Sequence, residues 1–352
     1  MIKLNAAQKR DMRLPKYREE GFLDFYEYHL ALKGHPGCVY FMLPYLEKRF
    51  KLDKEAYLWL CYLNGVTQNI MTTWQIFRDF PDFKSLNLGA LEKWHVKNWK
   101  ALPYDLDRRY QKGHLVEMTE DYIENLQGKT QEEFFDALTP HKDPLKNFDG
   151  AWEKVRNDFF MFGRLSTFSY LEYLKIAGVN LDCTTLFLDD MSGSLSHRNG
   201  ILKVMGHDNL EQHKKINPNV KHHAGTVALT EPYAAHLLAA AKLRFKTRSF
   251  FKDVNYFTLE STLCCYKSSF RVNRRYPNCY IDMMYDRIVK AAPLLGDDIK
   301  IFTDAREASL PEYALKGGIT KPKQNHFRET GQVLFLGNMF PNKYVKGLET
   351  SL

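Results

Sequence analysis

The stretch YLWLCYLNGVTQNIMTTWQIFRDFPDF, residues 57–83, decides the fold, because it places uncharged polar side chains inside an apolar helical pattern. Apolar residues recur there at intervals of three and four, so we expect one helix over residues 54–80. Its polar stripe consists of Asn64, Gln68, Thr72 and Gln75. A buried amide without a partner costs about 1–3 kcal/mol. The stripe therefore either joins a network between helices or receives a ligand with donors and acceptors, such as a nucleobase edge.

Helical periodicity also runs through most of the remaining chain. It covers residues 21–32, 37–50, 88–101, 119–126, 130–138, 151–177, 195–205, 230–245, 256–270 and 280–292. After residue 296 the pattern changes, and residues 297–304 and 331–340 have the apolar runs of short strands. We therefore expect a mainly α fold with a short-strand C-terminal extension.

Clusters of proline, glycine, asparagine and charged residues interrupt the helices at residues 81–88, 140–150 and 207–225. We expect an N-terminal helical subdomain over residues 1–150, which contains the base-reading helix 54–80. A second helical subdomain over residues 151–295 and an extension over residues 296–352 follow.

Composition excludes several classes of protein. No apolar run approaches the roughly 20 residues of a membrane span, and the charged first residues do not resemble a secretory signal, so we expect a cytoplasmic protein without a membrane partner. The six cysteines form no CxxC pair, and we expect no metal. Neither GxxxxGK[ST] nor GxGxxG occurs, which argues against kinase and dinucleotide chemistry.

A basic segment over residues 242–275 contains nine basic and two acidic residues, interleaved with aromatic residues. Such a pattern is typical of a nucleic-acid surface, although a solvated helix face has the same composition. Its candidate DNA-binding residues are Lys267, Arg271, Arg274 and Arg275.

Three segments resemble helix-hairpin-helix DNA glycosylases. They are LNGVTQNIMTTWQIFRDFPDFKSL (63–86), FFMFGRLSTFSYLEYL (159–174) and NLDCTTLFLDD (180–190). The first resembles an adenine glycosylase helix that bears a Gln-Thr pair, and the second a hairpin glycine that leads into a helix. The third stands where a glycosylase keeps its catalytic aspartate. Only one hairpin glycine, Gly163, is present, so the resemblance implies a glycosylase-like scaffold put to another use.

The whole chain more closely resembles a phage family of amino acid:DNA transferases, also described as glutamyl or putrescinyl thymine pyrophosphorylases. The residues that carry the resemblance are HPGCVYFMLPYL (35–46), WLCYLNGVTQN (59–69), FGRLSTFSYLEYL (162–174), LDDMSGSLSHRNG (188–200) and ESTLCCYKSSFRVNRRYPNCYIDMMYDRI (260–288). The resemblance implies phage DNA with phosphorylated 5-hydroxymethyluracil as substrate. An amino acid or polyamine amine then replaces the phosphate or pyrophosphate, giving a hypermodified thymine that protects viral DNA from restriction in the host cytoplasm. No cofactor is expected.

That chemistry needs an extruded base, cations for the leaving group and a carboxylate for the amine proton. The amides of Asn64, Gln68 and Asn69 match the uracil edge. The segment 182–199 supplies the candidate catalytic loop. Asp182, Asp189 and Asp190 are candidate general bases.

The same loop offers groups for an anion. Its candidates are Ser192, Ser194, Ser196, His197 and Arg198, which lie before or at an expected helix start. A turn capped by Asp190 and Ser192, with Arg198 in a surface ion pair, accounts for the same residues. Arg164 is a further candidate for DNA phosphate, and ordinary ion pairing explains it equally well. A true DNA glycosylase and a non-catalytic DNA-binding protein remain the alternative functions.

Overall fold

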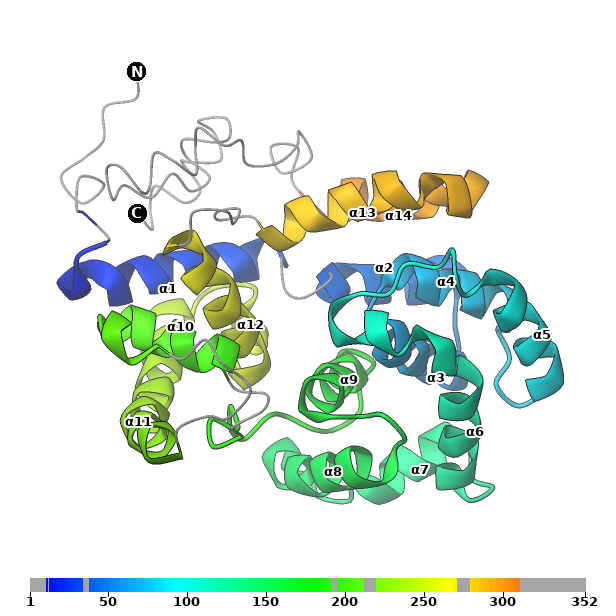
Figure 1. Ribbon diagram of the computed structural model, residues 1–352, viewed down its shortest axis with the longest axis horizontal. Helices are drawn as coiled ribbons and strands as arrows, with labels where there is room; N and C mark the ends of the chain where they lie inside the picture. The colour runs from blue at the N-terminus through cyan, green and yellow to red at the C-terminus, as the bar shows by residue number, and fades with distance from the viewer. Residues whose placement is uncertain are drawn as a thin grey trace. The chain divides into compact units, whose positions relative to one another are not determined.

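The computed structural model describes residues 11, 13–33, 38–190, 195–211, 220–270 and 279–310, and these residues contain no strand (Figure 1). Helices account for most of them, so the predicted mainly α fold is confirmed.

The chain divides into two compact units that are discontinuous in sequence. Unit 1 comprises residues 1–36, 185–285 and 310–352, and unit 2 comprises residues 37–184 and 286–309. The sequence predicts subdomains that are continuous in the chain, so these units group the helices differently.

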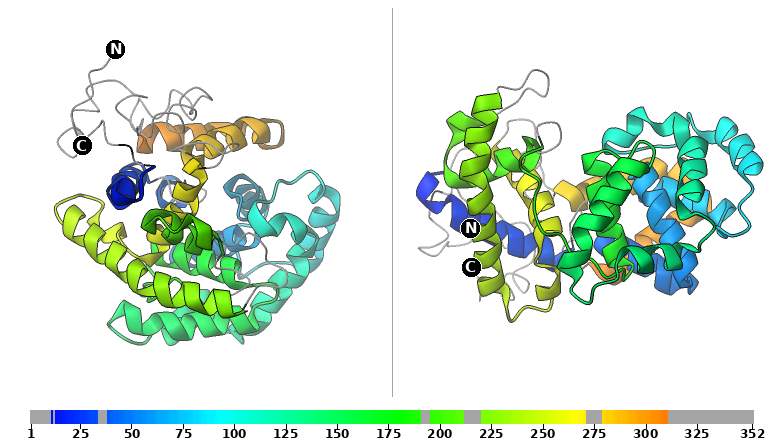
Figure 2. Two further views of the ribbon diagram at one scale, coloured as in Figure 1. Left: turned by 60° about the vertical axis from the view of Figure 1, so that its left-hand side comes forward. Right: turned by 90° about the horizontal axis from the view of Figure 1, so that it is seen from below.

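Unit 1 is built on four α-helices. They are α1 (Pro15–Ala31), α10 (Leu195–Met205), α11 (Val220–Phe245) and α12 (Tyr256–Tyr266), with short 3-10 turns at Asp208–Leu210, Phe251–Asp253 and Lys267–Phe270. The long α11 packs against α1 and α10, and α12 packs against the same two helices (Figure 2). Tyr26 of α1 ties this core together, because its hydroxyl lies 2.6 Å from the hydroxyl of Thr258 on α12.

Unit 2 contains the remaining helices. They are α2 (Val39–Phe50), α3 (Lys54–Thr67), α4 (Ile70–Asp79), α5 (Leu88–Asn98), α6 (Leu115–Leu126), α7 (Gln131–Leu138), α8 (Pro144–Asp158), α9 (Arg164–Ile176) and α14 (Ile299–Ser309), with 3-10 turns at Leu106–Tyr110, Lys112–His114 and Gly296–Asp298. Helix α13 (Cys279–Leu295) runs across the boundary between the two units in sequence.

Helix α3 forms the centre of unit 2 and packs against α4, α7 and α9. Its Tyr62 stacks on Tyr122 with ring centroids 3.8 Å apart and meets Tyr170 edge-on. Gly65 of α3 allows this packing, because a Cβ there would lie 3.2 Å from the Tyr170 ring. Buried aromatic rings therefore fix the position of α3.

The predicted helix over residues 54–80 is wrong in one respect, because it is broken into α3 and α4. Gln68 adopts a left-handed conformation (φ 49°) and ends α3 with a hydrogen bond from its N–H to the Asn64 carbonyl. The Asn69 side chain then accepts the N–H of Thr72 and caps α4. A capping side chain replaces a backbone acceptor that the broken helix no longer supplies. The predicted helix over residues 151–177 is likewise divided, between α8 and α9.

The strand predicted over residues 297–304 is also wrong, because this segment lies in the Gly296–Asp298 turn and α14. Phe302, Ala305 and Arg306 are buried at the three- and four-residue spacing of a helix, and α14 packs on α2. The other predicted strand, residues 331–340, lies outside the described residues.

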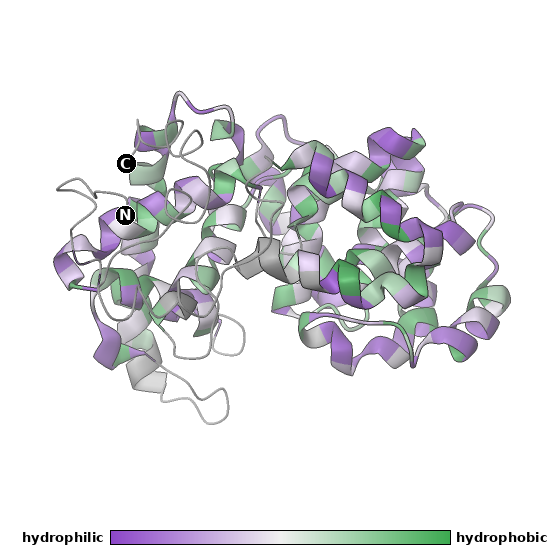
Figure 3. Cartoon of the chain, turned by 90° about the horizontal axis from the view of Figure 1, so that it is seen from above, coloured by the Kyte–Doolittle hydropathy of each residue, from purple (hydrophilic) through white to green (hydrophobic). Residues whose placement is uncertain are grey.

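Hydrophilic and hydrophobic residues alternate around individual helices, as amphipathic helices require (Figure 3). Within the described parts of the chain, no helix is both long and apolar enough to cross a membrane.

Candidate functional site

The break between α3 and α4 contains the side-chain amide of Gln68. The Gln68 side chain is buried, and neither its Nε2 nor its Oε1 has a hydrogen-bond partner among the described residues. Unsatisfied buried amides are rare in native proteins. Gln68 therefore offers both a donor and an acceptor to a ligand.

The two neighbouring amides are already engaged. The Asn64 Oδ1 accepts the hydroxyl of Thr73 at 3.1 Å. The Asn69 Oδ1 caps α4, and its Nδ2 donates to Asp105 at 2.8 Å. Of the three amides that the sequence singles out for a base edge, only Gln68 leaves both of its polar atoms available.

Asp105 joins this break to a charged group. Its carboxylate accepts from Asn69 and lies 3.0 Å from the Arg287 Nε, and its backbone N–H donates to the Thr67 carbonyl. Burial raises the pKa of Asp105, and the Arg287 charge and the Asn69 hydrogen bond only partly offset this effect. A carboxylate with a raised pKa accepts a proton more readily, which suits a general base.

Arg108 connects the same region to the turn between α8 and α9. Its guanidinium donates to the carbonyls of Gly65 and Met161 at 3.0 and 2.8 Å, and it stacks over the Phe162 ring. Because these carbonyls belong to α3 and to the α8–α9 turn, one buried cation holds both segments against the 3-10 turn Leu106–Tyr110.

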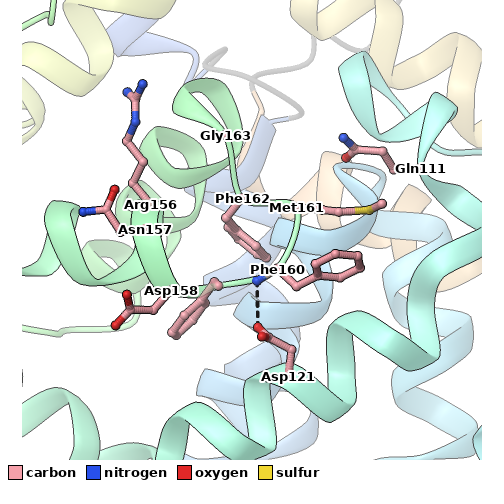
Figure 4. Close-up of a pocket in the computed structure, with 10 residues that line it drawn as sticks. Gln111, Asp121, Arg156, Asn157, Asp158, Phe160, Met161, Phe162 and Gly163 are labelled. Atoms are coloured by element: carbon pink, nitrogen blue, oxygen red, sulfur yellow. Dashed lines mark hydrogen bonds between the residues drawn. The ribbon is translucent and has the colours of Figure 1, made fainter.

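The α8–α9 turn is the segment that resembles a glycosylase hairpin. Its left-handed residue is Met161 (φ 61°), whereas Gly163 has an extended conformation as the N-cap of α9. The Phe160 N–H donates to the Asp121 carboxylate at 2.7 Å (Figure 4). The turn borders an open pocket of about 500 Å³, lined by Gln111, Asp121, Arg156, Asn157, Asp158, Phe159, Phe160, Met161, Phe162 and Gly163.

The candidate general bases lie in different surroundings. Asp182 pairs with Lys175 at 2.6 Å and belongs to unit 2. Asp189 is exposed and Asp190 partly exposed, and both belong to unit 1. The structure therefore does not place Asp182 in the same unit as Asp189 and Asp190.

The candidate anion-binding groups that precede or begin α10 are largely buried. His197 and Arg198 have no exposed surface, and the Arg198 guanidinium donates to the Leu188 carbonyl at 3.1 Å. Burial lowers the pKa of Arg198, and the charge of Asp190 partly offsets this effect. Ser196 accepts hydrogen bonds from the ammonium of Lys267. Ser192 and Ser194 lie outside the described residues.

The candidate DNA-binding residues that the structure describes are also buried. Arg164 is buried, with its guanidinium 5.3 Å from the centre of the Phe168 ring, and Lys267 is buried as well. Arg271, Arg274 and Arg275 lie outside the described residues.

The comparisons with known proteins decide the family. A profile of the amino acid:DNA transferases matches residues 42–275. The chain belongs to the amino acid:DNA transferase family. It is also similar to a serinyltransferase of Salmonella phage ViI, with 27% identity over 320 residues that cover 82% of this chain and 74% of the relative. No solved structure matches the chain.

Family membership makes the protein a transferase that acts on DNA and an amino acid. The matched segment includes Gln68, Asp105 and Arg108, but ends before Arg287. Sequence patterns did not single out Asp105 or Arg287, because neither lies near Asn69 in the chain. The cluster of charged and aromatic residues at 104–110 is a signal that could have drawn attention to this turn.

Proposed function

We propose that the protein replaces the phosphate or pyrophosphate of phosphorylated 5-hydroxymethyluracil in phage DNA with the amine of an amino acid. The amine nitrogen attacks the exocyclic methylene carbon, and a C–N bond forms as the C–O bond to the phosphate breaks. The leaving group departs with the electron pair of that bond, and the amine loses a proton to a carboxylate. The product is a hypermodified thymine, which protects the phage DNA from restriction enzymes in the host cytoplasm.

The buried amide of Gln68 is the observation that best supports recognition of an extruded base. Uracil presents two carbonyl acceptors and one ring N–H donor on its edge, which complement the Nε2 and Oε1 of an amide. Both Gln68 atoms lack partners among the described residues, so a base edge would satisfy them. Asn64 and Asn69 hold the break in place and keep proposed roles beside the base.

Asp105 adds a fourth candidate to the proposed general bases Asp182, Asp189 and Asp190. Its raised pKa favours proton uptake, and its hydrogen bond to Asn69 holds the carboxylate beside the residue that follows Gln68. Among the sequence candidates, Asp182 is less favoured because Lys175 already neutralises its carboxylate.

Exposed groups beside this site suit contact with DNA. Tyr110 is 78% exposed, and the guanidinium of Arg109 lies 4.9 Å from the centre of its ring. Phe160 on the α8–α9 turn is 42% exposed. Aromatic rings stack on unpaired bases, and neighbouring cations attract the phosphate backbone.

Serine is the first donor to test, because the phage ViI relative is named a serinyltransferase. Polyamines such as putrescine remain alternative donors, since a small donor pocket discriminates through contacts worth only about 1–3 kcal/mol.

Nucleoside mass spectrometry tests the proposal. Duplex DNA carrying phosphorylated 5-hydroxymethyluracil is incubated with the protein, the twenty amino acids and putrescine. The expected product is a nucleoside that has gained one amine and lost its phosphate. Release of free base would assign the protein to the DNA glycosylases instead, and unchanged DNA would favour a binding role without catalysis.

A further inference from the structure

Three side chains of unit 1, none of which belongs to the break between α3 and α4, bring metal-binding atoms together. The imidazole of His197, the carboxylate of Glu260 and the thiol of Cys264 each offer one ligand atom, and these atoms lie within 4.8 Å of one another. His197 and Glu260 are buried, and Cys264 is partly exposed. The sequence did not predict a metal here, because the ligands come from distant segments and form no spacing motif.

A close approach between α10 and α12 creates this cluster. Gly200 lies against the backbone of Leu263, and a Cβ at Gly200 would lie only 2.5 Å from the Leu263 carbonyl oxygen. His197 stands one turn before Gly200 on α10, whereas Glu260 and Cys264 flank Leu263 on α12. Because Glu260 and Cys264 are four residues apart, they share one face of their helix.

The hydrogen bonding of His197 orients its other ring nitrogen toward Glu260. Its Nε2 lies 3.0 Å from the Leu186 carbonyl, which can only accept, so this nitrogen carries the proton. In neutral imidazole the lone pair of Nδ1 then points at the Glu260 carboxylate, 3.1 Å away. A cation between two electron-rich groups this close and this buried, such as a second proton or a metal ion, would stabilise them.

The third group favours a metal ion. The Cys264 thiol donates a hydrogen bond to the same Glu260 oxygen at 3.6 Å, and after losing its proton it would supply a thiolate as the third ligand. In a tetrahedral zinc site, ligand distances of about 2.0–2.3 Å place nitrogen and oxygen about 3.3 Å apart, and sulfur and oxygen about 3.5 Å apart. A metal-bound histidine usually donates its other ring N–H to a carbonyl or carboxylate, as His197 does to Leu186.

We propose that His197, Glu260 and Cys264 bind a divalent metal ion of the zinc class. The nitrogen, oxygen and sulfur ligands are those that zinc accepts, and the partial exposure of Cys264 leaves a fourth position for water. The ion connects α10 to α12 and so stabilises unit 1 in its folded form. The proposal does not depend on the reaction that the enzyme catalyses.

Cobalt spectroscopy of the full-length protein tests this site. Co²⁺ added to the metal-free protein is expected to bind with one-to-one stoichiometry and to produce the near-ultraviolet charge-transfer band of a cobalt–thiolate bond. The band should be absent in Cys264→Ser and retained in Cys183→Ser, which alters a buried thiol outside the cluster. Zn²⁺ should abolish the band and raise the Tm of the wild-type protein.

Two results would overturn the proposal. One is a wild-type protein that produces no thiolate band and no Tm shift with either metal. The other is a band of equal strength in folded Cys264→Ser. If Cys264→Ser does not fold, Glu260→Gln is used as the variant that removes one ligand. The wild-type protein alone still shows, by its thiolate band and its Tm shift, whether a thiolate-bound metal is present.

Discussion

Gln68 combines a left-handed backbone conformation with a buried amide that lacks partners among the described residues. A non-glycine residue in that conformation is strained, and each unsatisfied amide atom adds a desolvation cost. Strain of this kind persists at functional sites, where a ligand or substrate compensates for it. The residue therefore links the stability of the enzyme directly to its proposed substrate.

Replacing Gln68 with methionine should raise stability and lower activity together. Methionine has a similar volume and removes both unsatisfied polar atoms, so the free energy of unfolding should increase by about 1–3 kcal/mol. The kcat/KM for amino acid transfer should fall at least about tenfold, as expected when a base-edge contact is lost. Urea unfolding and a transfer assay measure the two effects.

Asn69→Ala is the matched control on the adjacent residue. It removes the cap of α4 and the hydrogen bond to Asp105, so it should lower stability by about 1 kcal/mol. If Gln68→Met behaves in the same way and destabilises the protein, the Gln68 amide contributes to the native network and does not await a ligand.

Asp24 in α1 makes stability depend on pH. Burial raises its pKa from 3.8 to about 6, and the neighbouring charges of Glu20 and Glu27 add to this rise, although the pairing with Arg244 opposes it. The folded state binds the Asp24 proton more tightly than the unfolded state does. Its contribution to stability is therefore present below about pH 4 and is lost as the pH rises to about 6.

Asp24→Asn should remove this dependence. The free energy of unfolding of the variant, relative to wild type, should rise by about 1–3 kcal/mol between pH 4 and pH 6. Urea titrations of both proteins at several pH values measure this difference. A difference that stays constant over that range would show that Asp24 keeps its ordinary pKa in the folded protein.

At the scale of elements, the α10–α12 contact depends on the absence of a side chain at Gly200. Gly200→Ala places a Cβ against the Leu263 carbonyl, and overpacking of this kind costs about 1–3 kcal/mol. Gly150→Ala is the matched control, because no atom lies within 4 Å of its Cβ position on the exposed surface of α8. That variant should gain about 0.5–1 kcal/mol from helix propensity. Thermal unfolding of both variants separates the effect of overpacking from the effect of helix propensity. Equal changes in Tm for the two variants would contradict the close approach of Gly200 to Leu263.

The helices were predictable where amphipathic periodicity is strong. The start and end of α10 match the prediction. The helix α7 begins one residue later than predicted, because Thr130 is its N-cap. The break at Gln68 was not predictable, since it uses a left-handed glutamine where helices normally end at glycine. Residues 297–304 were assigned as a strand because so short a segment shows only one helical turn of apolar spacing.

At the scale of the whole molecule, the sequence indicated the transferase family and the Gln68 region but not the complete site. Asp105, Arg108 and Arg287 reach that region through tertiary contacts between segments far apart in the chain. His197 also illustrates the limit of sequence patterns, because the sequence predicts it as a group that meets an anion at a helix start, whereas α10 buries it completely. Periodicity predicts elements, and it does not predict which polar residues meet after folding.

DNA binding should be strongly salt-dependent, because the chain has a net charge of +8 and exposed cations beside the candidate site. Arg109→Ala should reduce the slope of log affinity against log salt by about 1 if the guanidinium contacts one phosphate. Fluorescence anisotropy with duplex DNA measures the slope, and Lys129→Ala, which lies in the α6–α7 connection, serves as the control. An unchanged slope in Arg109→Ala would place the DNA on another surface.

The most direct test of amine transfer follows the nitrogen and the phosphate in one reaction. DNA containing phosphorylated 5-hydroxymethyluracil is incubated with the enzyme and serine labelled with heavy nitrogen, and the nucleosides and released phosphate are both measured. We predict that one labelled nitrogen enters the modified nucleoside for every phosphate or pyrophosphate released. Loss of phosphate without incorporation of the label, or release of free base, would contradict amine transfer.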